Sequence, residues 1–582
     1  MPYVVTQSCC SDASCVYACP VNCIHPTPDE PDFRTAEMLY VDPKACVDCG
    51  ACATACPVDA IVSAKKLTDE QKPFIEINAD FYRQTRPRPL LARPVPAARI
   101  HTEGAPLRVA IVGSGPSAMY AADELLTQPD VSVTVFDRLP VPYGLARHGV
   151  APDHDKTRKV GELFDVISAQ PGFGSYLNVE IGAHISHAEL LDHFHAVIYA
   201  VGASSDRKLG IPGEALAGTV SATDFVAWYN GHPDYADYAF DLSARRAVIV
   251  GNGNVALDVA RVLTSDPQTL AGTDIAPYAL RALRESKIEE VVVLGRRGPL
   301  ESAFTVPEFV GLLGCDVDIV VEGELPERGA ELPFHIEQKL ALLHSARTRP
   351  VGERKRIVFR YLSAPTEILG TDRVTGVEIG RNELVTDPDG RVRAVATGET
   401  ERLEAGLVLT SVGYRGVAVP GLPFDEQAAV IPNEAGRVVL QRAEGPVVTG
   451  AYVTGWIKRG PTGFIGTNKS CAQETVRQLA ADFNAGRLPE PAGSAAEFDR
   501  LVRLRQPAVR AGGAAAARPG RLSRVMAPAR RARRGAGRSR PDTRRGQGPA
   551  ISAPGSRRSG RGAELFADEL RRNVSHVYYR LP

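Results

Sequence analysis

The sequence predicts a small α+β domain, then a larger α/β region with two nucleotide-binding units, and finally a disordered basic tail. Three observations predict this order. Nine of the eleven cysteines lie in the first 56 residues, two glycine-rich turns each follow a run of β-branched residues, and the composition changes beyond about residue 508. A chain of 582 residues is too long for one hydrophobic core, so several domains are expected.

The first predicted domain, residues 1–66, contains a cysteine spacing that binds iron–sulfur cubanes. Two, two and three residues separate four cysteines, and a proline follows the last of them: Cys46, Cys49, Cys52, Cys56 and Pro57. In two-cluster proteins with this run, the first three thiolates bind one cluster and the fourth binds the other. The alternative is a secreted disulfide framework, but we expect no signal peptide before the array. The chain is therefore predicted to transfer electrons.

The cysteine array is an internal repeat. Residues 15–24 match residues 52–61, with cysteines at the first and fifth positions of both. The same register, extended toward the N-terminus, places Asp12 opposite Cys49. The first half of the array therefore lacks one thiol. Cys10 falls opposite an apolar residue, and we expect it not to bind iron.

The register predicts two ligand sets. One has four thiolates and suits a [4Fe-4S] cluster: Cys19, Cys46, Cys49 and Cys52. The other has three: Cys9, Cys15 and Cys56. Three thiolates suit a [3Fe-4S] cluster; alternatively, the Asp12 carboxylate binds the fourth iron of a second [4Fe-4S] cluster, or Cys10 completes a cubane. Cys23 falls opposite Ala60 and is expected to be a buried thiol that does not bind iron.

Composition and charge exclude some classes of function. The formal net charge is zero, and no run approaches the roughly 20 apolar residues of a membrane-spanning helix. We therefore expect neither nucleic acid nor a membrane as a partner. A cytoplasmic location is the default expectation. Residues 67–106 are rich in proline and are predicted to be a semi-extended linker.

Residues 107–137 follow the order strand, glycine-rich turn, helix, strand and acidic residue. This is the fingerprint of a Rossmann dinucleotide-binding unit. Gly113 is predicted to make the tight turn, Gly115 to let the backbone approach a pyrophosphate, and Ala118 to let the helix pack on the strand. Asp137 would accept hydrogen bonds from the ribose hydroxyls. The alternative is a glycine turn in an α/β domain that binds no nucleotide.

A second fingerprint begins at residue 246, where a strand leads into Gly251, Gly253 and a helix. The next strand ends in Arg296 and Arg297 rather than in an acidic residue. Paired arginines at this position suit a 2′-phosphate, which favours NADP(H) over NAD(H). The alternative is two solvated arginines at the end of a strand.

Two dinucleotide units in one chain indicate a flavin that exchanges electrons with a nicotinamide. Four further motifs extend this pattern: residues 142–154, 251–261, 295–299 and 455–468. With them, residues 107–505 resemble adrenodoxin reductase, and residues 1–64 resemble the seven-iron bacterial ferredoxins. The whole chain resembles ferredoxin–NADP reductases of the adrenodoxin reductase type that carry a fused N-terminal ferredoxin.

The resemblance implies FAD and NADP(H) as cofactors and gives particular residues a role. FAD contacts around the adenosine and pyrophosphate are implied for Ser117, Asp137, Leu145 and Ile181. Contacts near the flavin ring are implied for Trp456, Gly463, Phe464 and Ile465, and Gly463 would also face the nicotinamide. Contacts with NADP(H) are implied for Asn252, Gly253, Asn254, Val255, Arg296, Arg297 and Glu308.

His154 and Glu308 match a polar pair beside the flavin and are the candidate catalytic residues. A proton must reach or leave reduced flavin, and this pair could tune its transfer. The alternative is that His154 caps a helix that starts at Lys156. Cys315 and Cys471 are single and far apart in the sequence, which argues against a disulfide reductase.

The predicted domains interleave. The FAD domain comprises residues 107–204 and 401–507, the NADP domain comprises residues 205–400, and residues 407–413 are predicted to be the strand that returns to the FAD domain. Residues 508–582 form an arginine-rich tail that is expected to be disordered. It could be a basic arm, or its composition could reflect a frameshift.

The predicted function is that of an NADPH:ferredoxin oxidoreductase. A hydride passes between NADP(H) and FAD, and single electrons pass through the clusters to or from a ferredoxin or another one-electron carrier. Two alternatives remain: an electron-input subunit of a larger iron–sulfur flavoenzyme similar to glutamate synthase, and an iron–sulfur scaffold without enzymatic activity.

Overall fold

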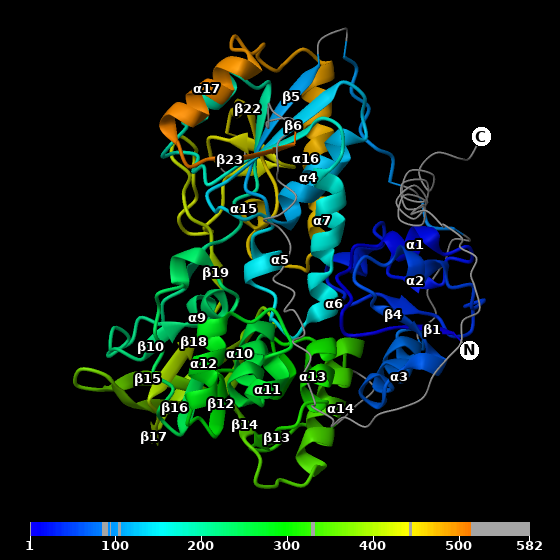
Figure 1. Ribbon diagram of the computed structural model, residues 1–582. Helices are drawn as coiled ribbons and strands as arrows, with labels where there is room; N and C mark the ends of the chain where they lie inside the picture. Colours follow the sequence, from blue (N-terminus) through cyan, green and yellow to red (C-terminus); the bar gives the residue numbers. More distant parts are fainter. Residues whose placement is uncertain are drawn as a thin grey trace, which may run out of the picture. The chain divides into compact units, whose positions relative to one another are not determined.

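The computed structural model describes residues 2–83, 91–93, 95–102, 106–327, 332–441 and 445–513 (Figure 1). Three groups of strands organise this part of the chain: two short pairs near the N-terminus, an eight-stranded sheet and a six-stranded sheet. Most of the arginine-rich tail, from residue 514 on, lies outside the described residues.

The N-terminal domain is a small α+β fold. The strands are β1 (Tyr3–Val5), β2 (Ile24–His25), β3 (Tyr40–Val41) and β4 (Ile61–Ser63). They pair antiparallel, β1 with β4 and β2 with β3. The helices are α1 (Ser14–Ala18), α2 (Ala51–Ala55) and α3 (Pro73–Asp80).

The predicted repeat is visible in the backbone. Helix α1 follows Ala13, with φ 62°, and α2 follows Gly50, with φ 80°, so both begin after a left-handed residue. Each helix ends at a cysteine in extended conformation, Cys19 after α1 and Cys56 after α2. The sequence register therefore corresponds to two copies of one local structure.

Helix α3 corrects the predicted linker. Residues 67–106 were expected to form a spacer, but Phe74, Ile77 and Phe81 are buried in the core of the first domain. The Asn78 side chain donates to Val5 O at 2.9 Å and accepts from the backbone N–H groups of Val5 and Val41. Apolar residues three and four positions apart predict this helix, but the nearby prolines obscured the pattern.

The first nucleotide-binding unit contains an eight-stranded sheet in the order β20-β21-β22-β8-β5-β6-β7-β23. Its strands are β5 (Leu107–Val112), β6 (Val131–Asp137), β7 (Phe173–Leu177), β8 (Ala196–Tyr199), β20 (Asn433–Glu434), β21 (Arg437–Val439), β22 (Val447–Val453) and β23 (Arg510–Gly513). The five strands from β22 to β7 are parallel. Its helices are α4 (Pro116–Leu126), α5 (Leu145–His148), α6 (Asp155–Arg158), α7 (Val160–Ser168), α8 (His187–Leu191), α15 (Trp456–Arg459), α16 (Thr467–Asn484) and α17 (Ala495–Arg505).

The second unit contains a parallel sheet in the order β10-β18-β11-β12-β14-β13. Its strands are β10 (Thr219–Ser221), β11 (Arg246–Val250), β12 (Glu290–Gly295), β13 (Asp318–Glu322), β14 (Arg356–Tyr361) and β18 (Leu407–Thr410). Its helices are α9 (Ala222–Tyr229), α10 (Asn254–Thr264), α11 (Pro267–Leu270), α12 (Pro277–Glu285), α13 (Val306–Leu313) and α14 (Phe334–Thr348). An antiparallel sheet of β15 (Ser363–Gly370), β16 (Val374–Thr386) and β17 (Val392–Glu404) extends from it (Figure 1).

Two domain boundaries differ from the prediction. Residues 407–413 were expected to return to the first sheet, but β18 pairs with β10 and β11 of the second. The chain returns after it, at β19 (Tyr414–Arg415), which pairs with β9 (Ser205–Asp206). The tail was expected to begin at residue 508, but β23 pairs antiparallel with β7. A short apolar run predicts a strand without indicating which sheet it joins.

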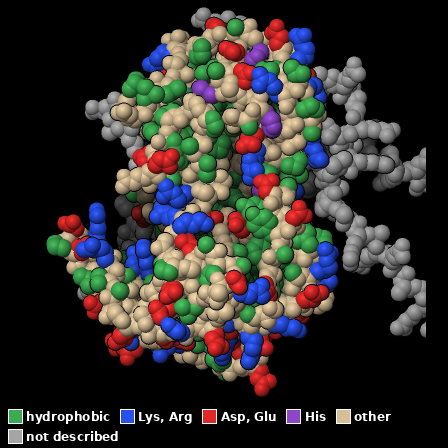
Figure 2. All heavy atoms as spheres, turned by 90° about the vertical axis from the view of Figure 1, so that its left-hand side faces the viewer, with side chains coloured by type: hydrophobic (Ala, Val, Ile, Leu, Met, Phe, Trp, Pro, Cys, Tyr) green, Lys and Arg blue, Asp and Glu red, His purple; other side chains and the backbone are tan. Residues whose placement is uncertain are grey.

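Charges of both signs are interspersed over the face shown in Figure 2, without a large area of one sign. This distribution agrees with the formal net charge of zero. Among the helices that the structure describes, none is long and apolar enough to cross a membrane.

Candidate redox site

A cavity of about 560 Å³ brings together residues from both nucleotide-binding units and the N-terminal domain. The predicted site residues in its wall are Cys9, Gly113, Gly115, Ser117, Asp137, Leu145, His154, Ile181, Asn254, Val255, Glu308, Trp456, Gly463, Phe464 and Ile465. Five predicted nucleotide-binding residues and six predicted cluster ligands, all within the described part of the chain, are not in this wall: Ala118, Asn252, Gly253, Arg296, Arg297, Cys15, Cys19, Cys46, Cys49, Cys52 and Cys56. The roles of individual residues stay predictions.

The first glycine turn has the geometry that a dinucleotide requires. Gly113 has φ +102°, and a Cβ built there would lie 2.4 Å from the carbonyl oxygen of Ala200. A Cβ at Gly115 would meet nothing within 4 Å, so this backbone borders open space at the start of α4. A helix N-terminus facing open space is a site for a phosphate group. The turn therefore fits the pyrophosphate of FAD.

Asp137 follows β6 and is held in place at the edge of the cavity. Its carboxylate accepts from Ser114 N at 3.0 Å, from the Ser114 hydroxyl and from Leu139 N at 2.8 Å. Burial raises the pKa of Asp137 despite these hydrogen bonds. A carboxylate has about four acceptor positions, so acceptor capacity is left for a ribose hydroxyl.

The second glycine turn repeats this geometry before α10. Gly251 has φ +112°, and a Cβ there would lie 2.2 Å from the carbonyl oxygen of Ser411. Arg296 and Arg297 follow β12, the strand beside β11, and both are exposed. Neither guanidinium group has an ion pair or hydrogen bond with any residue that the structure describes. Two unpaired cations beside this turn fit a bound phosphate.

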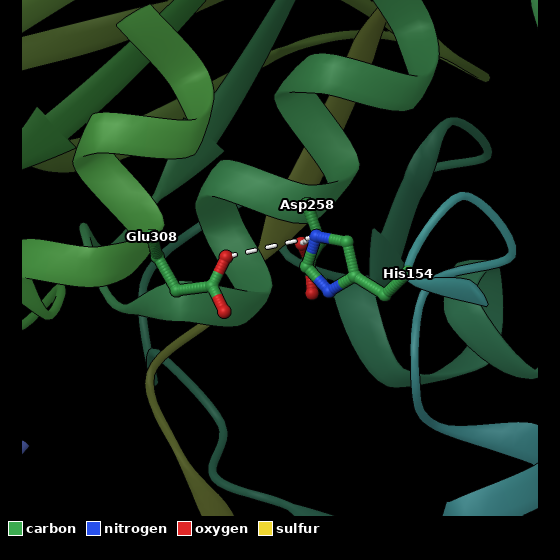
Figure 3. A group of neighbouring side chains, drawn as sticks. All are labelled: His154, Asp258 and Glu308. Carbon is green, nitrogen blue, oxygen red and sulfur yellow. Dashed lines mark ion pairs between the residues drawn. The ribbon is translucent and has the colours of Figure 1, made fainter. Parts of the chain in front are cut away.

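His154 lies beside two carboxylates, those of Asp258 and Glu308 (Figure 3). Its Nε2 atom is 3.7 Å from Asp258 Oδ1 and 3.7 Å from Glu308 Oε2. Burial raises the pKa of Glu308. His154 does occupy the N-cap position of α6, which begins at Asp155 and not at Lys156, but its side chain makes no cap hydrogen bond. The sequence reasoning did not select Asp258, although it lies in the motif of residues 251–261.

Arg261 anchors this group from α10. Its guanidinium binds both oxygens of Asp153, at 2.7 and 2.9 Å, and Asp258 Oδ1 at 2.8 Å. Burial by itself would raise the pKa of Asp153, but the hydrogen bonds and charge of Arg261 outweigh it and lower that pKa. Asp258 is thus fixed next to His154 by a buried cation.

Helix α15 and the loop after it carry the residues predicted to lie near the flavin ring. Trp456 Nε1 donates to Thr462 O at 3.1 Å, and its ring lies 5.3 Å from that of Tyr414. Gly463 has φ +85°, and a Cβ there would lie 2.3 Å from Thr467 Oγ1. The loop then reaches the N-terminal domain, where Gly466 N donates to Cys10 O at 2.7 Å.

The charges that act on the cysteines follow the two predicted sets in part, since those of Cys19 and Cys46 also act on Cys23, and those of Cys9 and Cys56 also act on Cys10. Burial raises the pKa of Cys52 to about 12, and the charges of Cys46, Cys19 and Cys49 add to this effect. In the second set, burial together with the charges of Cys9 and Cys56 raises the pKa of Cys15. Burial and neighbouring thiols favour the neutral form, and bound iron would favour the thiolate form instead.

Hydrogen bonds to sulfur also follow the repeat. Cys23 N donates to Cys19 Sγ at 3.4 Å, and Ala60 N donates to Cys56 Sγ at 3.3 Å. All eleven cysteines are free thiols. The donor set therefore fits iron–sulfur clusters and not a disulfide framework. Cys10 and Cys23 are buried, but so are Cys15, Cys19 and Cys52, and Cys23 Sγ lies 3.4 Å from Cys19 Sγ, so their expected exclusion from iron binding stays a prediction.

Comparison with known proteins identifies the family. Residues 107–269 match the family described as pyridine nucleotide-disulphide oxidoreductase, and residues 39–62 match the 4Fe-4S binding domain. A probable ferredoxin/ferredoxin–NADP reductase of Mycobacterium leprae is 55% identical over 87% of this chain and 91% of its own. The chain belongs to the ferredoxin/ferredoxin–NADP reductases.

The reductase has further relatives that cover its larger part. The mitochondrial NADPH:adrenodoxin oxidoreductase of Arabidopsis thaliana is 41% identical over 66% of this chain and 83% of its own. The structure of Mycobacterium tuberculosis FprA in complex with NADPH has a TM-score of 0.65 and 46% identity, and the match covers 70% of this reductase and 92% of FprA. The predicted fold class and family are thus confirmed.

Proposed function

We propose that the reductase transfers a hydride between NADP(H) and FAD in the cavity, and single electrons between FAD and the iron–sulfur domain, which exchanges them with a ferredoxin or another one-electron carrier. One observation carries the proposal: Cys9 lines the same cavity as the first glycine turn and Glu308. FAD, when bound, supplies the chemistry that converts a two-electron donor into two one-electron steps.

The protein's own residues have two tasks in this proposal: they bind and orient the two cofactors, and they hold a proton near the flavin. The turn at Gly113 and Gly115 would bind the pyrophosphate of FAD, and Phe464 and Ile465, which line the cavity, would contact the flavin ring. Glu308 accepts or holds a proton beside His154, because burial raises the pKa of this carboxyl. Arg296 and Arg297 bind a 2′-phosphate, which selects NADP(H).

The ligand sets support one [4Fe-4S] cluster on Cys19, Cys46, Cys49 and Cys52, and a [3Fe-4S] cluster on Cys9, Cys15 and Cys56. Asp12 is the candidate for a fourth ligand of the second set, but its carboxylate is already engaged. It accepts from Ser14 N at 3.0 Å and from Ser14 Oγ at 2.6 Å, and lies 3.5 Å from Lys469 Nζ. These contacts favour three irons over carboxylate ligation.

Replacement of Asp12 by cysteine tests this assignment. Asp12→Cys restores the full spacing, so we expect four irons at the site, because thiolate is the usual cluster ligand. An oxidised three-iron cluster has an odd electron count and gives an EPR signal, which the variant should lose. Asp29→Cys adds a thiol outside the repeat and should change nothing. An unchanged signal in Asp12→Cys, with altered iron content in Cys10→Ala, would contradict the assignment.

The function itself is tested on the anaerobically purified holoenzyme. Analysis should find FAD, iron and sulfide, and NADPH should bleach the flavin absorption and then reduce the clusters. A protein with clusters but no flavin would overturn the proposal in favour of an iron–sulfur scaffold. Co-purification with a large catalytic partner, and no transfer to a ferredoxin, would favour an electron-input subunit.

A further inference from the structure

We propose that the two cysteine sets have different places in electron transfer: the set of Cys9, Cys15 and Cys56 is the entry side that exchanges electrons with the flavin, and the set that contains Cys49 is the exit side that faces the partner protein. This inference rests on the proposed function. It states the order in which electrons reach the two sets, and the presence of two clusters does not by itself determine that order.

The entry side is argued from contacts with the flavin loop. Cys9 and Cys10 line the cavity together with Phe464 and Ile465. Gly466, the next residue of that loop, donates from its backbone N–H to Cys10 O at 2.7 Å. A Cβ at Gly466 would lie 2.2 Å from Asp12 N, so the two backbones are packed against each other.

Apolar packing agrees with these contacts. Cys10 belongs to the core of the first nucleotide-binding unit, and Cys9 and Cys56 pack against that core. Lys469, near the start of α16, lies 3.5 Å from Asp12 and so adds an ion pair across the same junction. Of this set, Cys9 therefore lies at the wall of the cavity and Cys56 against the neighbouring core, while Cys15 lies in the core of the N-terminal domain.

The exit side is argued from exposure. Cys49 is the one exposed thiol among the eleven, all of which the structure describes. The loop around it, residues 44–49, is mostly exposed, and Val47 is 58% exposed. Cys19, Cys46 and Cys52 belong to the core of the N-terminal domain or pack against it, not to the nucleotide-binding cores. A partner's redox centre can thus approach this set through few atoms.

The sets are close enough to act in series. Helix α1 carries Cys15 of the entry set and ends at Cys19 of the exit set, and α2 carries Cys52 of the exit set and ends at Cys56 of the entry set, so each helix joins the two sets. A hydride brings two electrons from NADPH to the flavin, and each electron then passes singly from the entry set to the exit set and to one acceptor molecule. Two acceptors are reduced for each NADPH oxidised, and one proton is released.

Rapid-freeze EPR after anaerobic mixing with NADPH tests the order. In Cys15→Ala, the rate of reduction of the four-iron cluster, divided by the rate of flavin bleaching, should fall at least tenfold. In Cys46→Ala, reduction of the three-iron cluster relative to flavin bleaching should stay within about twofold of wild type. Reduction of cytochrome c, as the protein acceptor, should fall at least tenfold in both. Wild-type reduction of the four-iron cluster in Cys15→Ala would overturn the order; failure of NADPH to bleach the wild-type flavin would instead overturn the proposed function.

A second variant keeps every thiol, in case a cysteine variant does not fold. Gly466→Ala should separate the flavin loop from Cys10 and Asp12 and slow cluster reduction at least tenfold, while iron, sulfide and flavin contents stay at wild-type values. Gly161→Ala is the control, because a Cβ on this helical glycine meets nothing within 4 Å. Equal rates in the two glycine variants would contradict the entry side.

A separate observation carries a second inference: we propose that Gln7 of the N-terminal domain is a positioning residue for Glu308. Gln7 Nε2 donates to Glu308 Oε2 at 3.0 Å, the same oxygen that lies 3.7 Å from His154 Nε2. A Cβ at Gly311 would lie 2.2 Å from Gln7 Nε2, so the amide is packed against α13.

Glu37 holds the start of the same helix. Its Oε2 accepts from Val306 N at 2.7 Å, and its Oε1 pairs with Lys339 Nζ at 2.7 Å; both side chains are nearly buried. Gln7 and Glu37 also line the cavity. The iron–sulfur domain therefore fixes the helix that carries the candidate proton-holding carboxylate of the nicotinamide site.

Stopped-flow flavin bleaching by NADPH over a range of pH tests this role. The charged groups that face Glu308 are His154, Asp258 and Arg261, and the Gln7 amide stabilises the ionised carboxylate. Gln7→Ala should slow bleaching about tenfold and move its pH profile upward, with little change in NADP⁺ affinity. Gln7→Glu should slow flavin bleaching more than Gln7→Ala does at neutral pH. The rate of bleaching in Gln7→Glu should recover as the pH falls. Gln71→Ala, in the same domain, is the control. A wild-type rate and profile in Gln7→Ala would overturn the inference.

Discussion

Replacing both Arg296 and Arg297 with alanine should raise the KM for NADPH by about 100-fold or more, because each hydrogen bond to a charged group contributes about 1.5–3 kcal/mol. The KM for NADH should change little, since NADH lacks the 2′-phosphate. Both side chains are exposed and unpaired among the described residues, so their removal should not disturb the fold. Steady-state kinetics with the two nucleotides measures the difference.

The control for this pair is Arg381→Ala. Arg381 is exposed on β16, next to Asn382, whose side chain donates to Arg296 O at 2.9 Å. Loss of this neighbouring charge should leave the preference for NADPH near wild type. Equal losses with NADPH and NADH in the double variant would show that the two arginines do not bind the 2′-phosphate.

Arg261→Met should destabilise the second nucleotide-binding unit by about 3–5 kcal/mol, the cost of removing one partner from a buried ion pair. The change leaves the carboxylates of Asp153 and Asp258 without their cation, and methionine cannot donate a hydrogen bond to either. The free energy of unfolding measures the loss, and flavin bleaching should slow because Asp258 no longer has a fixed position beside His154.

The loss should depend on pH. The pKa of Asp153 is lowered in the folded protein, so its stabilising contribution is present above the unfolded value, about 4. That contribution disappears as pH falls through the folded pKa. Wild type and variant should therefore converge in stability in acid. Arg281→Met, on the exposed side of α12, should cost no more than about 0.5 kcal/mol, and an equal cost in the two variants would contradict the prediction.

Local patterns predicted the elements around the nucleotides well. The strand predicted at residues 107–112 is β5, and the one at residues 131–136 is β6 with one more residue. The cysteine register also matches the paired helices of the first domain. These features could be predicted because each depends on a short segment of sequence, in which residue type and spacing determine the backbone conformation.

Long-range pairings could not be predicted from such patterns. Gln7 and Glu308 are 301 residues apart, and neither position has a periodic or motif signal that links it to the other. Asp258 lies in a motif, but its role depends on where α10 places it relative to His154. For the same reason the apolar run of β18 gave no indication of its sheet. The Gln7–Glu308 contact, the role of Asp258 and the sheet that β18 joins all depend on how elements distant in the sequence pack together.

The backbone contact between Gly466 and Cys10 has a kinetic consequence. Because the donor and the first acceptor are parts of one chain, their encounter does not require diffusion, and its rate is set by an effective concentration instead of a bulk one. Transfer from the flavin to the entry set of Cys9, Cys15 and Cys56 should then be first order and independent of enzyme dilution. Ionic strength should affect only the later, bimolecular meeting with the outside carrier, since salt screens the attraction between separate proteins.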